Sequence, residues 1–168
     1  GVWRNPDHTM ELMIGTARLL REEYSFPGYI HLKVIPGCDP QLVRSAAFYA
    51  DRLSVNVELP REESLSRLAP QKDFQGILGQ MALLAELARE GRERVKGGRG
   101  GSPLMPAGHT TQLVVGASQD DDLTILSATQ RLYGEFGLRR VYYSAFIPVG
   151  EDPRLPGDAL PPLRREHR

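Results

Sequence analysis

The chain has 168 residues, 40% of them hydrophobic and 25% charged, which is enough for one globular domain with a buried core. Its 21 basic and 21 acidic residues cancel, so no overall field favours nucleic acid or an anionic membrane surface. No apolar run approaches the ~20 residues of a membrane span, and the one cysteine, Cys38, excludes an internal disulfide framework and a multi-cysteine metal site made by this chain alone.

The first part of the chain predicts helices and strands in alternation. Apolar residues at helical spacing predict an amphipathic helix over Pro6–Tyr24. A strand is expected over Tyr29–Ile35, and a helix then follows Asp39 and Pro40, a cap residue and a proline suited to the first turn. The next strand, Leu53–Leu59, alternates apolar and polar side chains, so it has one apolar and one polar side.

The middle of the chain continues the alternation. Helices are expected over Glu62–Leu68 and from Phe74 to Val95. A loop from Lys96 to Pro106 follows, with four glycines, and it matches no nucleotide-binding motif. Thr111–Ala117 predicts a further strand.

The last predicted elements are a capped helix and a strand. Ser118, with Asp121 three residues later, predicts the start of a helix that runs to Phe136, where Gly137 fits the carboxyl-terminal cap. Val141–Pro148 predicts the fourth strand. Such regular alternation indicates an α/β fold of parallel βα units, either wound open or closed as a barrel.

Both ends of the chain suggest a longer parent protein. A helix start at Asn5-Pro6-Asp7 follows Gly1 almost at once. At the other end, the segment Leu163–Arg168 stops without a terminator after the proline-rich stretch Gly150–Pro162. We therefore expect a fragment of a larger protein, and the lone cysteine favours a cytoplasmic setting.

The four expected strands each place polar groups on one side. Helices that cover such a sheet would force these groups to find partners or a ligand, because burying an unpaired charge costs several kcal/mol. We interpret the polar side as a ligand-lined face, and a solvated face of a half-covered sheet is the alternative. The residues are His31 and Lys33; Ser54, Asn56 and Glu58; Gln112; and Tyr142 and Ser144.

Lys33 carries two further hypotheses. It could pair with Glu58 across adjacent strands, which would satisfy both charges. It could also be the Schiff-base nucleophile of a lyase, since a desolvated amine attacks carbonyl groups. A third alternative is a non-catalytic module that uses the polar face as a ligand pocket.

Other titratable residues are given structural roles. His31 and His109 are expected to be hydrogen-bonding or surface residues, and no two histidines stand at metal-ligand spacing. The three aspartates at positions 120–122 are interpreted as charges that complement a helix dipole. Cys38 is expected to be a bystander at a strand end, and no metal ligand is predicted.

Four runs of the sequence are distinctive as a set: Tyr29–Gly37, Ala50–Pro60, Pro106–Ala117 and Val141–Val149. Together they resemble a family of radical S-adenosylmethionine (radical SAM) proteins that are described as DNA modification or repair proteins. The resemblance covers nearly the whole chain. No single run would be enough to carry it.

The resemblance implies a partial, TIM-like (β/α) barrel, of which residues 1–150 are the later half. Residues 151–168 are then an irregular proline-rich segment that leads into a truncated C-terminal extension. In such enzymes a 4Fe-4S cluster, held by three cysteines in a C-x-x-x-C-x-x-C loop, cleaves S-adenosylmethionine, and the resulting radical abstracts hydrogen from a substrate. That loop is not in this chain, so we expect the cluster ligands in the intact parent and no activity from this fragment alone.

The resemblance also implies binding residues and partners. Asn56 and Glu58 are candidates for polar contacts to cofactor or substrate, and Gly116 for close backbone approach beside adenine. Gln112 and Lys33 are further candidates. The implied partners are the small-molecule cofactor and nucleic acid, the latter bound through an extension that begins near Leu163, with no membrane partner.

Overall fold

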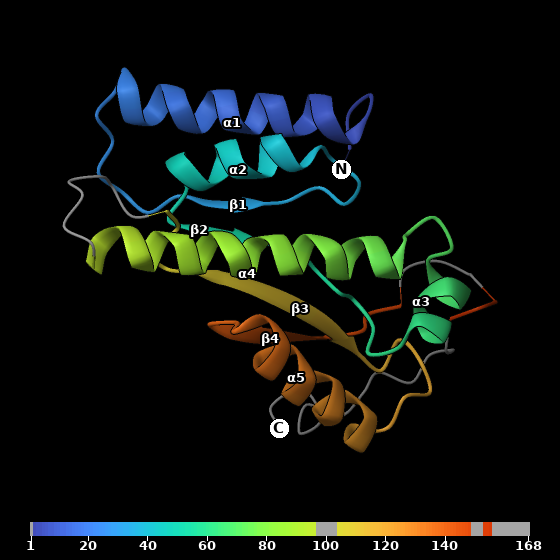
Figure 1. Cartoon of the computed structure of the whole chain (residues 1–168). Helices are drawn as coiled ribbons and strands as arrows, with labels where there is room; N and C mark the ends of the chain where they lie inside the picture. The colour runs from blue at the N-terminus through green and yellow to red at the C-terminus, as the bar shows by residue number, and fades with distance from the viewer. Residues whose placement is uncertain (1, 97–103, 149–152, 156–168) are drawn as a thin grey trace.

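The computed structural model describes residues 2–96, 104–148 and 153–155, which form an α/β fold (Figure 1). Part of the loop predicted at Lys96–Pro106 and most of the segment Gly150–Pro162 lie outside these residues. The helices are α1 (Pro6–Glu22), α2 (Pro40–Tyr49), α3 (Glu62–Leu68), α4 (Phe74–Lys96) and α5 (Asp122–Phe136). The strands are β1 (His31–Lys33), β2 (Arg52–Ser54), β3 (His109–Val115) and β4 (Arg140–Ala145).

The strands form one parallel sheet in which neighbours along the chain are neighbours in space. Their order is β1-β2-β3-β4, so each connection moves the chain one strand along the sheet. Lys33 lies opposite Ser54, Ser54 opposite Thr110, and Thr110 opposite Arg140. These four residues form one row across the sheet, and the parallel βα organisation predicted from the alternation is confirmed.

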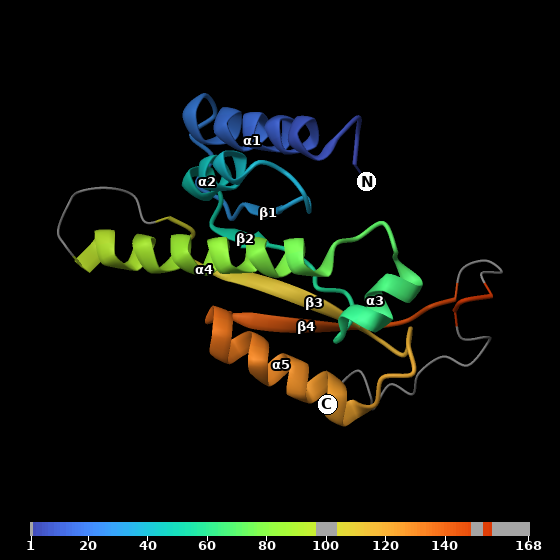
Figure 2. The same ribbon diagram turned by 45° about the vertical axis from the view of Figure 1, so that its right-hand side comes forward.

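The helices α2, α4 and α5 lie on one side of the sheet, and α1 packs against α2 outside this layer (Figures 1 and 2). Right-handed connections between successive neighbouring strands all return over the same face, which explains the one-sided layer. The core between helices and sheet includes Leu53 and Leu113 from the strands and Ile77, Met81 and Leu84 from α4. Each such buried side chain stabilises the fold by about 1.5–3 kcal/mol relative to exposure.

Two helices begin where local signals place them. The Asn5 side chain accepts a hydrogen bond from the His8 amide at 2.8 Å, and Pro6 occupies the first turn of α1. The Asp39 side chain caps α2 in the same way, through the Gln41 amide at 2.7 Å. No helix in the three described ranges is both long and apolar enough to cross a membrane.

The start of α5 differs from the prediction by three residues. Asp121, and not Ser118, is the cap, because its carboxylate accepts a hydrogen bond from the Thr124 amide at 2.8 Å. Ser118 instead donates its hydroxyl proton to Asp120. The predicted cap at the other end is confirmed, since Gly137 takes a left-handed conformation with φ of 59°.

The second strand is shorter than predicted. Regular pairing ends at Ser54, and a single bridge between Glu58 and Leu113 follows. From the Ser54–Thr110 pair to this bridge, the chain advances four residues after β2 but only three along β3. The extra residue on the β2 side forms a bulge. Glu58 has a φ of 67° there, a left-handed conformation that an L-residue rarely adopts. The predicted continuous strand Leu53–Leu59 is therefore wrong beyond Ser54.

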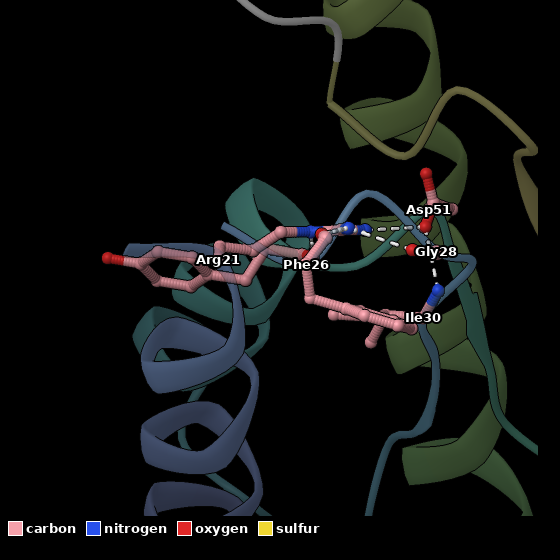
Figure 3. Close-up of polar contacts among 6 residues, drawn as sticks. Arg21, Phe26, Gly28, Ile30 and Asp51 are labelled. Atoms are coloured by element: carbon pink, nitrogen blue, oxygen red, sulfur yellow. Dashed lines mark hydrogen bonds and ion pairs between the residues drawn. The ribbon is translucent and has the colours of Figure 1, made fainter. Parts of the chain in front are cut away.

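At the amino-terminal edge of the sheet, Arg21 of α1 ties three segments together (Figure 3). Its Nη1 donates to the carbonyl oxygens of Phe26 and Gly28 at 2.7 and 2.8 Å. Its Nη2 donates to the Asp51 carboxylate at 2.6 Å, and the same carboxylate oxygen accepts the Ile30 amide at 2.7 Å. This network fixes the entry of the chain into β1 and β2.

Candidate functional site

The face of the sheet opposite the helix layer carries polar side chains from all four strands. His31 Nε2 lies 2.9 Å from Ser54 Oγ, which joins β1 to β2. Gln112 Nε2 donates to Ser144 Oγ at 2.9 Å, which joins β3 to β4. For these four residues the predicted shared polar side is confirmed. We call this surface the uncovered face, since no helix of the described residues lies on it (Figures 1 and 2).

Arg52 links β2 to β4 across the uncovered face. Its Nη1 donates to the Tyr142 hydroxyl at 3.1 Å, and its guanidinium carbon lies 5.6 Å from the centre of the Tyr29 ring. Arg140 lies 5.6 Å from the centre of the Tyr142 ring. Because β3 lies between β2 and β4, the Arg52 side chain must cross β3 on the side that bears Thr110. Arginine and tyrosine side chains therefore interleave over the middle of the sheet.

Two polar atoms in this region are buried without a partner. Thr110 is 1% exposed, and its hydroxyl makes no hydrogen bond with the described residues. The Nε of Arg52 is likewise buried and unpaired within the described part of the chain. A buried donor without an acceptor costs about 1–3 kcal/mol. Both atoms are therefore available to a ligand that reaches the floor of this face.

Arg52, Thr110 and Arg140 were not selected from the sequence, although the alternation contains the signal. Each stands two positions before a strand residue that was assigned to the polar side. The three residues assigned there are Ser54, Gln112 and Tyr142. Since strand side chains repeat their direction every second residue, extending each strand by one pair would have found them.

Two predicted site residues, Asn56 and Glu58, lie beyond the end of β2, and their contacts differ. Glu58 forms an ion pair with Lys72, whose Nζ lies 2.8 Å from its Oε1. The predicted pair of Lys33 and Glu58 is therefore wrong, because the bulge aligns Glu58 with Leu113 of the helix-covered side. Asn56 stays half-buried with no hydrogen bond from its side chain to the described residues.

Gly116 lies directly after β3, where ligands of parallel sheets bind. Its φ of 88° falls in the region that favours glycine, and the residue is half-buried. The absence of a side chain leaves the backbone open to close approach. The backbone contact expected of Gly116 stays a prediction.

Lys33 is exposed on the uncovered face and forms no ion pair with the described residues. A Schiff-base lysine acts from a desolvated pocket or beside another cation. The surroundings of Lys33 do not enclose it, so no observation favours the lyase hypothesis. Lys33 instead contributes a positive charge at the rim of the face.

After β3 lies a buried carboxylate, Asp120, with a set of side-chain partners that the sequence did not reveal. The Asp120 side chain is fully buried and accepts hydrogen bonds from Ser64, Ser118 and Arg61. Burial alone raises the pKa of Asp120, but the hydrogen bonds from the two serines and Arg61, with the charge of Arg61, outweigh it and lower that pKa below 3.8. Asp120 is thus held as an anion by its side-chain partners, while Asp121 caps α5 and Asp122 lies in its first turn, as expected for charges that complement the helix dipole.

A groove of about 820 Å³ lies between the β1–α2 turn and the first half of α4. Cys38 lines it and is buried, and burial together with the nearby Asp7 raises the pKa of its thiol to about 11. The thiolate is the form that binds metals and reacts, so this cysteine is inert near neutral pH. Cys38 lies directly before Asp39, the cap of α2, and not at the end of β1, which finishes at Lys33.

His109 is buried at the start of β3, contrary to the expected surface or hydrogen-bonded position. Neither ring nitrogen has a hydrogen-bond partner among the described residues. Burial, with a smaller contribution from the positive charge of Arg92, lowers the pKa of His109 to about 4, although the nearby Phe136 carbonyl opposes the shift. His109 is therefore neutral at pH 7 and belongs to the core.

The described residues contain no group of three or more histidine, cysteine, aspartate or glutamate side chains placed to hold a metal ion. Comparisons with protein-family models, with curated proteins and with solved structures gave no match.

Proposed function

We propose that the uncovered face is one wall of the ligand cavity of a radical SAM (β/α) barrel, and that this chain supplies the later strands of that barrel. One observation carries the proposal. The strands follow one another in sequence order, the helices α2, α4 and α5 lie on one side (Figures 1 and 2), and the opposite side carries the polar pairs His31–Ser54 and Gln112–Ser144.

This arrangement favours a barrel segment over a doubly wound sheet. In a doubly wound sheet the strand order reverses and helices cover both faces. In a (β/α) barrel each strand is followed by the next around the ring, and all helices lie outside. The inner face of a barrel is normally packed with branched apolar residues. Polar pairs such as His31 with Ser54 therefore support an inner face that contacts a ligand.

The proposed ligand contacts lie toward the carboxyl ends of the strands. The half-buried Asn56 amide, which has no hydrogen-bond partner among the described residues, is suited to the polar groups of S-adenosylmethionine. Gly116 would admit a flat ring close to the backbone, and Gln112 would line the wall between them. Glu58 acts through Lys72 in this proposal, as a residue that positions the turn before α4.

The residues of this chain fit the cofactor's polar groups but not the iron–sulfur cluster. A 4Fe-4S cluster requires several cysteine thiolates, whereas the chain has one cysteine, which is buried with a pKa of about 11. The cluster that cleaves S-adenosylmethionine must therefore be held by other residues of the parent protein. This chain would bind the cofactor, orient it and exclude water on one side.

Binding of S-adenosylmethionine to the chain tests the proposal. Equilibrium dialysis with S-adenosylmethionine and with S-adenosylhomocysteine should show saturable binding. Asn56→Leu removes the amide at similar volume and should weaken binding by up to about tenfold, the value of one hydrogen bond. Gln130→Leu removes an exposed amide from α5, away from the uncovered face, and should leave binding unchanged.

The outcomes separate the alternatives. No saturable binding of either compound to the folded chain would overturn the cofactor assignment. Equal losses in Asn56→Leu and Gln130→Leu would remove Asn56 from the site. Formation of 5′-deoxyadenosine by the 168 residues alone, after reconstitution with iron and sulfide, would show that the cluster ligands lie within this chain and contradict the division of labour.

A nucleic-acid partner bound through the C-terminal extension stays a prediction. The extension was expected from about Leu163, which lies outside the described residues. A gel-shift assay with the parent protein, compared before and after removal of that extension, is the direct measurement.

A further inference from the structure

We propose that the uncovered face also binds a phosphate group, held by Arg52, Lys33 and Arg140 above the hydroxyl groups of Ser54 and Thr110. The inference rests on the proposed function only in placing a ligand on this face. It adds the chemical class of a second ligand, distinct from the positively charged sulfonium cofactor. Three independent features of the face support it: its charge, its shape and its unpaired donors.

The charge of this face is one-sided. The chain as a whole has equal numbers of acidic and basic residues. Among the described residues, register and alternation place Lys33, Arg52 and Arg140 on the uncovered face and no aspartate or glutamate beside them. None of these three cations forms an ion pair with a described residue. A surface of this kind attracts and retains an anion.

The shape of the face suits an anion that is held from the rim and the floor. Lys33, Ser54, Thr110 and Arg140 form one row, with the long cationic side chains at the ends and the short hydroxyl side chains in the middle. Neighbouring strands lie about 4.8 Å apart, so the row spans about 14 Å. A phosphate group at its centre can be reached from both ends and from Arg52.

The unpaired donors identify what the site lacks. The Thr110 hydroxyl and Arg52 Nε are buried without acceptors among the described residues. A tetrahedral oxyanion offers several acceptor oxygens, and arginine binds phosphate through two parallel hydrogen bonds. In this structure one Nη of Arg52 donates a hydrogen bond to the Tyr142 hydroxyl. Exchange of that bond for a bond to phosphate would open access to Thr110 and satisfy both orphan groups.

His31 is consistent with this assignment. Burial and the positive charge of Arg52 lower the pKa of His31, so the ring is neutral at pH 7 and can share a hydrogen bond with Ser54. The anion would then be met by permanently charged side chains rather than by a titrating imidazole. Binding should accordingly persist above pH 7, where a histidine-based site would lose its charge.

Phosphate of this kind has two sources, a free phosphorylated small molecule or the backbone of a nucleic-acid strand. The exposed rings of Tyr29 and Tyr142 beside the arginines could stack a base in either case. Three probes separate the sources: inorganic phosphate, adenosine monophosphate and a short single-stranded oligodeoxynucleotide. Each is titrated by calorimetry at low and at physiological salt.

The decisive variants change the face without touching the core. Arg52→Gln should weaken phosphate binding by about ten- to hundredfold, because a charged hydrogen-bond donor is lost. Thr110→Val keeps the volume of the side chain and removes the unpaired hydroxyl, so it should weaken binding several-fold while the melting temperature stays equal or rises. Arg131→Gln makes the same charge change on exposed α5 and should have little effect.

Two results would overturn the phosphate site. One is the absence of saturable binding of all three probes to the folded wild-type chain. The other is an equal loss of affinity in Arg52→Gln and Arg131→Gln, which would indicate non-specific charge attraction only. Binding of S-adenosylmethionine to the wild-type chain is measured in parallel and keeps the two proposals apart, because saturable cofactor binding without binding of any phosphate probe would overturn the phosphate site alone.

Discussion

An arginine contacts a carboxylate at the amino-terminal edge of the sheet, where the strands begin, and another such pair lies at the carboxyl-terminal edge, where the strands end. The two pairs differ in their other hydrogen bonds. At the amino-terminal edge, one Nη of Arg21 donates a hydrogen bond to Asp51. The other Nη and Nε donate to main-chain carbonyls, including that of Tyr49 at 3.1 Å from Nε. At the carboxyl-terminal edge, the side chains of Ser64, Ser118 and Arg61 donate hydrogen bonds to Asp120, and Arg61 is half exposed.

This difference indicates that the amino-terminal edge contributes more to the stability of the fold. A hydrogen bond to a main-chain carbonyl fixes the path of the chain, and the amino-terminal edge is therefore closed by its own backbone. Bonds between side chains can be exchanged for bonds to a ligand without moving the backbone. In (β/α) barrels, ligands meet the carboxyl-terminal edge, and the opposite edge serves the fold.

The largest expected effect concerns His109 at the amino-terminal edge. Its pKa is about 4 in the folded chain and 6.5 without burial, so the unfolded state gains a proton first as the pH falls. Stability should therefore be complete above pH 6.5 and fall by about 3 kcal/mol by pH 4. Urea unfolding at a series of pH values measures this loss. His109→Phe should abolish most of it, and an unchanged pH dependence in that variant would contradict the buried neutral ring.

The second prediction breaks the Arg21–Asp51 network. Asp51→Ala leaves the half-buried Arg21 and the Ile30 amide without their shared acceptor and should lower the free energy of unfolding by about 2–3 kcal/mol. The urea midpoint is the measurement. Glu22→Gln is the control, because its contact with Arg18 is exposed and the glutamine oxygen can still accept the hydrogen bond from the Tyr49 hydroxyl, so the change should cost less than about 0.5 kcal/mol. Equal costs in the two variants would show that Asp51 is no more than a surface charge.

The features set by adjacent residues could be predicted more easily than those set by contacts between distant parts of the chain. Helix starts such as Asn5 and the stop at Gly137 are written in a few adjacent residues, and the structure places them as expected. The bulge before Glu58 could not be predicted, because it depends on how that residue pairs with Leu113 far along the chain.

The sequence also did not show that Asp120, and not Asp121 or Asp122, is the buried aspartate. Three adjacent aspartates look equivalent, and only the approach of Ser64 and Arg61 from another part of the fold distinguishes one of them. The polar side of the sheet was partly predictable, since a period of two is a local pattern. Its charge balance was missed because Arg52 and Arg140 lie at strand ends, where boundaries are hardest to assign.

The third prediction tests whether the Asp120 cluster is weaker in stability than the network at the opposite edge. Asp120→Asn should cost about 1–2 kcal/mol at pH 7, because the half-exposed Arg61 can turn to water. The folded pKa is depressed, so the contribution is present above pH 3.8 and is lost as the pH falls through the lower folded value. The difference between wild type and variant should therefore shrink below pH 3.8, and a constant difference at all pH values would refute the charged role.

The smallest expected effect lies at Glu58, where the bulge places an L-residue in a left-handed conformation with φ of 67°. Glycine adopts that conformation without the side-chain clash, which costs other residues roughly 1 kcal/mol. Glu58→Ala and Glu58→Gly both remove the ion pair with Lys72, so their difference isolates the backbone. Glu58→Gly should be more stable than Glu58→Ala by about 1 kcal/mol in urea unfolding. At Ala128, inside α5, the replacement of alanine by glycine should instead lower stability by up to about 1 kcal/mol. If glycine were the worse residue at both positions, the bulge would not be strained, and the carboxyl-terminal edge would lose one of the features that set it apart.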